Sequence, residues 1–244
     1  MKADKKILEK GKRVSTGIPG MDPLINGGFK RKSINLVAGG AGSGKTILAL
    51  QFLLEGIKKG ESGIYITFEE RRDKTYEDML GFGWDLEKYE KEGRFIYLEY
   101  TPEQVKKILI EGGGMIENII EKTKATRIVI DSITSFSLLY EDELTKKEAA
   151  LALFDLINEW NCTAILTSQD EERNGTTISA ALEFEVDSII IMYHSRVDGH
   201  RERAIEILKM RGTKIPERAF SLVIDKNGIE INPRKEVDFK CQVK

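Results

Sequence analysis

A glycine-rich segment near the start of the chain carries the residue types that bind phosphate. Its residues are Gly39, Gly40, Ala41, Gly42, Ser43, Gly44, Lys45 and Thr46. They match Gly-x-x-x-x-Gly-Lys-Ser/Thr at every fixed position. Glycines let several backbone N–H groups converge on phosphate oxygens. We expect Lys45 to reach the β- and γ-phosphates of ATP and the Thr46 hydroxyl to hold Mg²⁺.

The surroundings of this segment favour a phosphate-binding loop over a chance match. An apolar run at residues 33–38 predicts a strand before it, and an amphipathic pattern at 45–59 predicts a helix after it. A helix N-terminus presents unpaired N–H groups to an anion. The four fixed positions alone would match by chance about one time in a hundred in such a chain.

An acidic partner for the metal follows a second apolar run. Residues 127–130 are Arg-Ile-Val-Ile, and Asp131 comes directly after them. If the strands are parallel, Asp131 lies at the same sheet edge as the phosphate loop and can complete the Mg²⁺ shell. The alternative is that Asp131 only ends a strand or begins a turn.

Two further strand ends carry candidate catalytic residues. Glu69 and Glu70 follow the run at 64–68, and either carboxylate could activate the attacking water; we favour Glu69, the first residue beyond the strand. Gln169 follows the run at 164–167 and could sense the γ-phosphate, coupling the nucleotide to the loop at 170–177. The alternatives are ordinary surface acids and an ordinary exposed loop.

The order of patterns predicts an α/β fold. Strands at 33–38, 63–68, 95–98, 127–130, 164–167 and 188–192 alternate with helical patterns at 45–59, around 76–80, from 102, and at 145–160. Such unbroken apolar strands indicate a mainly parallel sheet with helices on both faces. Runs at 204–209, 219–224 and 229–231 predict an antiparallel extension. We expect one domain over 1–244, with a core at about 14–231 and charged tails.

Local signals set two helix starts and one break. Thr101 precedes Pro102 as an expected N-cap, and a Thr145–Glu148 capping box is expected for the later helix. The three glycines at 112–114 are expected to break a helical pattern.

Composition limits the partners. Lys and Arg number 38 against 40 Asp and Glu, a net charge of -2, so an overall basic nucleic-acid binder is not favoured. Two cysteines, Cys162 and Cys241, indicate no disulfide framework and a reducing cytoplasm. No apolar stretch is long enough to span a membrane, and the start lacks a signal-peptide pattern.

Taken together, these motifs resemble the RecA-type ATPase superfamily, most closely its KaiC-like branch. The carriers are STGIPGMD at 15–22, Gly27-Gly28, the phosphate loop, TFEE at 67–70, IDS at 130–132 and KMRGT at 209–213. The resemblance implies rings, often hexamers, with ATP between subunits. It also implies that Lys209 and Arg211 reach the neighbour's γ-phosphate, with Thr213 nearby. The alternative is two solvated cations on an edge strand.

Departures from the family and open alternatives narrow the expected function. Circadian KaiC proteins are tandem duplications, whereas this sequence holds one such unit, and RadA-type recombinases carry an N-terminal DNA-binding domain not seen here. The leading hypothesis is an Mg²⁺-dependent, ring-forming ATPase. One alternative is a nucleotide-gated signalling or scaffold module with an unknown protein partner. Another is a DNA-binding recombinase paralogue in which the loop after Gln169 and the charged segment His194–Arg203 line a basic channel. That segment could also bind phosphate or face a ring pore, and it could equally be a charged hairpin tip.

Overall fold

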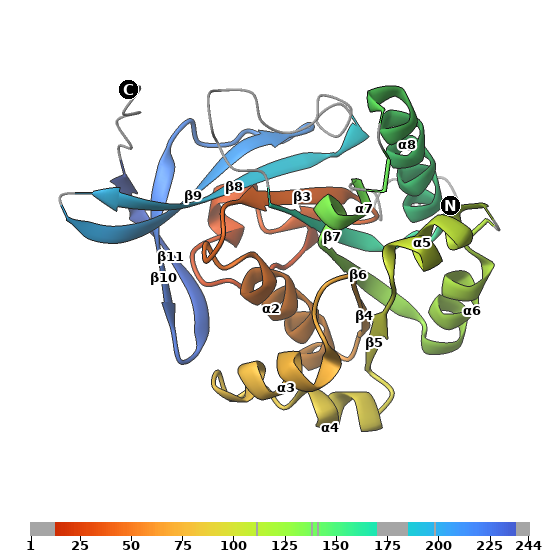
Figure 1. Ribbon diagram of the computed structural model, residues 1–244. Coiled ribbons are helices and arrows are strands. Elements are labelled where there is room, and N and C mark those ends of the chain that lie inside the picture. Colours follow the sequence, from red (N-terminus) through yellow and green to blue (C-terminus); the bar gives the residue numbers. More distant parts are fainter. Residues whose placement is uncertain are drawn as a thin grey trace, which may run out of the picture.

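The computed structural model describes residues 13–110, 112–137, 139–140, 142–169, 185–197 and 199–237. They form a nine-stranded sheet in the order β11-β10-β9-β8-β3-β7-β6-β4-β5 (Figure 1). The strands β1 and β2 pair in a separate two-stranded sheet. The strands are β1 (Arg13–Val14), β2 (Phe29–Lys30), β3 (Ile34–Gly39), β4 (Ser62–Thr67), β5 (Phe95–Glu99), β6 (Ala125–Asp131), β7 (Thr163–Ser168), β8 (Ser188–Val197), β9 (His200–Met210), β10 (Ala219–Asp225) and β11 (Gly228–Val237).

The six neighbouring strands β8, β3, β7, β6, β4 and β5 run parallel to one another. The sheet then continues beyond β8 with the antiparallel strands β9, β10 and β11. The helices are η1 (Asp22–Ile25), α2 (Lys45–Lys58), α3 (Arg72–Leu80), α4 (Leu86–Lys91), α5 (Pro102–Ile110), α6 (Gly114–Thr123), α7 (Ile133–Ser137) and α8 (Glu143–Glu159). No helix among the described residues is long and apolar enough to cross a membrane. The predicted α/β class with an antiparallel extension is confirmed.

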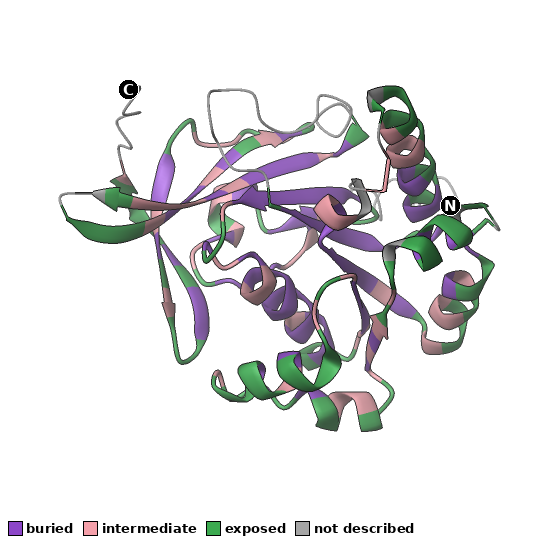
Figure 2. Ribbon diagram, viewed as in Figure 1, coloured by how far each residue is buried: buried purple, intermediate pink, exposed green. Residues whose placement is uncertain are grey.

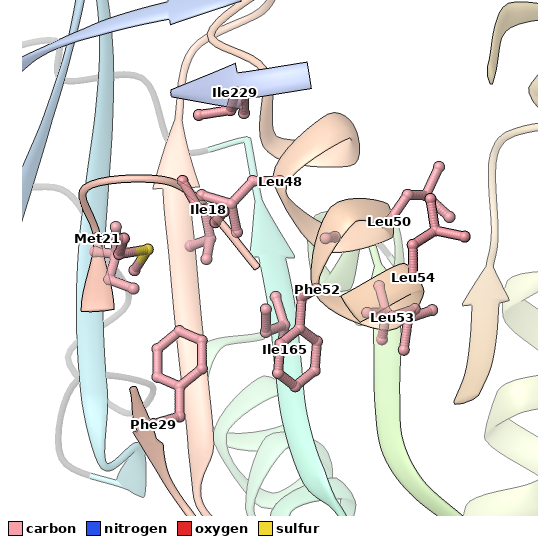
Figure 3. Close-up of a cluster of buried hydrophobic side chains, with 14 of the residues drawn as sticks. Ile18, Met21, Phe29, Leu48, Leu50, Phe52, Leu53, Leu54, Ile165 and Ile229 are labelled. Atoms are coloured by element: carbon pink, nitrogen blue, oxygen red, sulfur yellow. The ribbon is translucent and has the colours of Figure 1, made fainter. Parts of the chain in front are cut away.

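Alternating side chains of the central strands build two cores. Val37, Val129 and Ile165 belong to a cluster with α2, which also takes in the segment before β2 and the β10–β11 hairpin (Figure 3). Leu36 and Ile128 belong to the opposite cluster, beneath α5, α6 and α8. The central strands are therefore buried on both faces (Figure 2), as parallel sheets require.

The local signals are partly right. Thr101 caps α5 as predicted, because its backbone N–H donates to Gln104 Oε1 and its Oγ1 accepts from Gln104 N. The capping box at Thr145 is wrong: α8 begins earlier, and Asp142 accepts from Thr145 N at 2.8 Å. Aspartate is the stronger N-cap because its carboxylate also meets the positive end of the helix dipole.

The strands β8 and β9 extend further than their apolar runs. Their pairing continues past Met192 to Val197 and His200, so the charged segment is the end of a long hairpin. The exposed polar residues at the ends of these strands do not form an apolar run, so the sequence shows no strand pattern there, although their backbones are paired. The glycine break is confirmed, since α5 ends at Ile110 and α6 begins at Gly114.

A buried arginine ties the first part of the chain to the sheet. Arg127 on β6 is 1% exposed and pairs with Glu61 Oε2 at 2.6 Å. Its Nη1 donates to Ser15 O and Phe52 O, and its guanidinium lies over the Phe52 ring. The guanidinium therefore joins β6, α2 and the segment after β1.

Gly56 leaves the space that this guanidinium fills. A Cβ at Gly56 would lie 2.4 Å from Arg127 Nε, whereas a Cβ at Gly114, also in a helix, would meet nothing within 4 Å. We expect Gly56→Ala to lower the free energy of unfolding by about 1–3 kcal/mol through overpacking. Gly114→Ala is expected to be neutral or stabilising by up to about 1 kcal/mol. Denaturant unfolding of both variants tests this; equal effects would contradict it.

Candidate nucleotide-binding site

The phosphate loop connects β3 to α2 at the carboxyl edge of the parallel strands. Gly42 and Gly44 have φ values of 73° and 106°, a conformation open to glycine at little cost. Lys45 Nζ donates to Gly39 O at 2.7 Å and Gly40 O at 3.1 Å. Burial lowers the pKa of Lys45, and the charges of Asp131 and Glu69 oppose that shift. The lysine is thus held over the loop, in the field of both carboxylates.

Asp131 is the meeting point of three strands and the loop. Its Oδ2 accepts from Thr46 Oγ1 at 2.8 Å and from Tyr65 OH at 2.7 Å, and its Oδ1 accepts from Thr167 Oγ1. The predicted approach of Asp131 to the loop therefore occurs. The hydroxyl of Thr46 and the carboxylate are oxygen donors side by side, a set suited to Mg²⁺, which takes one or two protein ligands and completes its shell with phosphates and water.

Glu69 is held beside Asp131 by three side chains. Its Oε1 accepts from Ser132 Oγ at 2.9 Å and from Ser135 Oγ, and its Oε2 accepts from Gln169 Nε2 at 3.0 Å. Gln169 is anchored in turn, because its N–H donates to Thr134 Oγ1. Glu69 and Gln169, each predicted from a strand end, are therefore neighbours in space.

Glu70 has a different environment from Glu69. Its carboxylate accepts from Thr75 Oγ1 at 3.3 Å, which directs it toward α3. Burial, and then the negative charge of Asp131, raise the pKa of Glu70. The Thr67 hydroxyl accepts the backbone N–H groups of both glutamates and so fixes the turn. The loop expected at 170–177 lies outside the described residues.

The structure does not bring Lys209, Arg211 and Thr213 to the phosphate loop of their own chain. Met210 pairs with Ser188, which lies level with Asn35, four residues before Gly39. That offset is roughly 13 Å along the strands. Thr213 instead accepts from Arg13 Nη2 at 2.8 Å. These three residues occupy the opposite edge of the sheet.

Two side chains of the charged segment His194–Arg203, for which phosphate binding was one of several expectations, lie beside the phosphate loop. Arg203 Nε donates to Gly42 O at 3.1 Å, and a Cβ at Gly42 would lie 3.2 Å from His194 Nδ1. Buried His194 Nδ1 and Ser43 Oγ have no hydrogen-bond partner among the described residues. Unpartnered buried polar atoms beside a phosphate loop suit a polar ligand. The signal for His194 and Arg203 in the sequence was the cluster of two histidines and three arginines at 194–203.

This fold and this site define a RecA-like P-loop nucleotide-binding protein. A family model described as "ATPase: KaiC" matches residues 14–236. The chain therefore belongs to the KaiC ATPase family.

Two relatives and one solved structure show how this chain compares. It is 35% identical to the circadian clock protein KaiC3 of Synechocystis, covering 93% of this chain but 47% of the relative, so it spans about half of that protein's length. It is 33% identical to a UPF0273 protein of Thermotoga maritima, covering 91% and 96% of the two chains. The crystal structure of a KaiC-like protein from Pyrococcus horikoshii superposes with a TM-score of 0.81 at 35% identity, covering 91% and 99%.

The hydrogen bond from Tyr65 to Asp131 makes a testable contribution to stability. We expect Tyr65→Phe to lower the free energy of unfolding by about 1–3 kcal/mol, because a buried carboxylate loses one of its donors. Tyr89→Phe is the matched control, since the Tyr89 hydroxyl makes no hydrogen bond to a described residue. Denaturant unfolding without nucleotide measures both. A Tyr65→Phe protein as stable as the control would contradict the assignment.

Proposed function

We propose that the protein hydrolyses ATP in a Mg²⁺-dependent reaction at the phosphate loop. The observation that carries the proposal is the 2.8 Å contact of Thr46 with Asp131, next to a lysine within the field of Asp131 and Glu69. Phosphate, metal and water-activating groups of a P-loop NTPase are thereby gathered at one edge of the sheet.

Each residue of the site has a distinct task in this proposal. Lys45 exchanges the carbonyls of Gly39 and Gly40 for phosphate oxygens, and the loop N–H groups bind the remaining oxygens. Thr46 and Asp131 hold Mg²⁺, which when bound neutralises charge on the β- and γ-phosphates. Glu69 orients the attacking water and accepts its proton.

Gln169 links the nucleotide to the catalytic carboxylate. Its amide donates to Glu69 Oε2 at 3.0 Å, so a γ-phosphate that draws this amide away would free one carboxylate oxygen for water. Glu69 keeps the hydroxyls of Ser132 and Ser135 as fixed supports. The amide then acts as a sensor of the γ-phosphate. Glu70, turned to Thr75, is the secondary candidate base.

Two substitutions test hydrolysis directly. We expect Lys45→Ala to abolish ATP turnover with weakened ATP binding, because the phosphates lose their cation. Glu69→Gln is expected to slow turnover about 100-fold or more while ATP binding persists, since the amide cannot accept a proton. Glu70→Gln tests the secondary candidate base and should keep most of the activity if Glu69 is the base. Phosphate release and fluorescent-nucleotide binding measure the two properties; equal turnover in all variants would refute the proposal.

The nucleotide site is completed by a second copy of the chain in our proposal. Lys209, Arg211 and Thr213 lie at the edge opposite the loop. A ring in which this edge of one subunit faces the loop of the next places the two cations at the neighbour's γ-phosphate, with Thr213 nearby. A cation supplied in this way stabilises transition-state charge and makes turnover depend on assembly. The head-to-tail contact closes into a ring, for which we propose a hexamer.

Mixing two inactive variants tests shared sites. Lys45→Ala lacks the loop lysine and Arg211→Ala lacks the proposed trans cation, so each alone is expected to be inactive. Random mixed rings contain some interfaces with both groups intact, and about a quarter of the wild-type rate should return. Phosphate release from the mixture against each variant alone measures the rescue. An Arg211→Ala protein with normal turnover, or no rescue in rings shown by light scattering to mix, would exclude a shared site.

A further inference from the structure

A cavity lined by charged and polar side chains lies at the amino ends of the parallel strands. It has a volume of about 260 Å³. Its lining residues are Arg13, Val14, Ser15, Arg31, Lys32, Lys59, Glu61, Thr126, Arg127, Asn161 and Thr163. The strands β6 and β7 begin at this cavity and end at Asp131 and Ser168, so it is separated from the phosphate loop by the length of the sheet.

The lining is strongly positive in a chain whose net charge is -2. Five of its side chains are cationic and one, Glu61, is acidic. Glu55, just outside, pairs with Lys59 at 2.7 Å. Arg31 forms no ion pair with a described residue. More positive charge gathers here than the neighbouring carboxylates balance.

The positive charge of the cavity affects the pKa of Glu61. Burial alone would raise the pKa of this carboxyl. The hydrogen bond and charge of Arg127, the hydrogen bond from Thr126 and the charge of Arg31 instead hold its pKa below the ordinary value. The carboxylate therefore stays ionised, and the positive charge of the cavity still exceeds it.

The inner wall supplies fixed hydrogen-bond donors. Arg127 donates from Nε to Glu61 and from Nη1 to the carbonyls of Ser15 and Phe52, whereas its Nη2 makes no hydrogen bond to a described residue. Thr163 Oγ1 accepts from Lys32 N, which leaves its own hydrogen for another acceptor. Because Arg127 is 1% exposed and held by these contacts, it is a built part of the wall and not a solvated surface cation.

We propose that this cavity binds a small phosphate-bearing anion, with Arg31 and Lys32 at its mouth and Arg127 at its inner wall. Guanidinium groups match phosphate oxygens in charge and geometry. The volume of about 260 Å³ accommodates one phosphate or a pyrophosphate but is at the small end for a larger ligand. A small anion is favoured over a nucleic-acid strand because the cations gather around one pocket in a chain whose net charge is -2.

Calorimetry with inorganic phosphate and pyrophosphate tests the site at constant ionic strength in chloride. The Lys45→Ala background weakens binding at the phosphate loop, so the outcome does not depend on the proposed ATPase. In that background we expect saturable binding of pyrophosphate, weakened about tenfold or more by Arg31→Gln with Lys32→Gln. The matched control changes Arg234 and Lys235, an adjacent exposed pair on β11, to Gln and should leave binding intact.

Three outcomes would overturn the proposal. They are no binding in the Lys45→Ala protein, equal weakening in the cavity and control variants, and binding of a single-stranded oligonucleotide without binding of either phosphate. Thermal melting by circular dichroism checks the fold of each variant. Arg31→Gln alone, at an exposed position without an ion pair to a described residue, repeats the measurement with the least disturbance of the fold and should also weaken binding.

Discussion

The carboxylate of Asp131 is the interaction on which the nucleotide site depends. It accepts hydrogen bonds from Thr46 at the start of α2, Tyr65 on β4 and Thr167 on β7. A largely buried carboxylate needs such donors to remain where it is. The same bonds fix the first turn of α2, and with it the phosphate loop, against the sheet. The hydrogen bonds of Asp131 therefore fix the position of the phosphate loop and the position of the carboxylate together.

A second layer of contacts extends from this carboxylate to the candidate catalytic base. Ser132 follows Asp131 directly and donates to Glu69, which Gln169 reaches from the end of β7. Neighbouring parallel strands end at one edge, so residues far apart in the sequence converge within hydrogen-bond distance. This convergence gives one mechanism by which the state of the nucleotide could be transmitted to the segment after Gln169.

The two edges of the sheet carry different chemistry. The carboxyl edge holds the phosphate loop and its carboxylates, while the amino edge holds Lys209, Arg211 and the cationic cavity around Arg127. In the head-to-tail assembly that we propose, these two unlike edges would meet. Arg13 bridges the two features of the amino edge, since it lines the cavity and donates to Thr213.

The sequence by itself determined the phosphate loop, the mainly parallel fold and the strand ends that carry Glu69, Asp131 and Gln169. Those features are local: a glycine pattern, or an apolar run that stops at a polar residue. The observed limits differ from the predicted ones where polar residues continue a strand, as in β8 and β9. They also differ at α8, where Asp142 and not Thr145 is the N-cap.

Only the tertiary structure decided which side chains meet. Tyr65 and Thr167 lie within apolar runs and read as core, yet their hydroxyls bind Asp131. Arg203 reaches the loop across the sheet from a hairpin. The cationic cavity draws on separate segments, from the strands β6 and β7 to the charged residues Arg31, Lys32 and Lys59, and no single segment indicates it. Local patterns record how each residue sits in its own element, whereas a site is made by the packing that brings distant elements together.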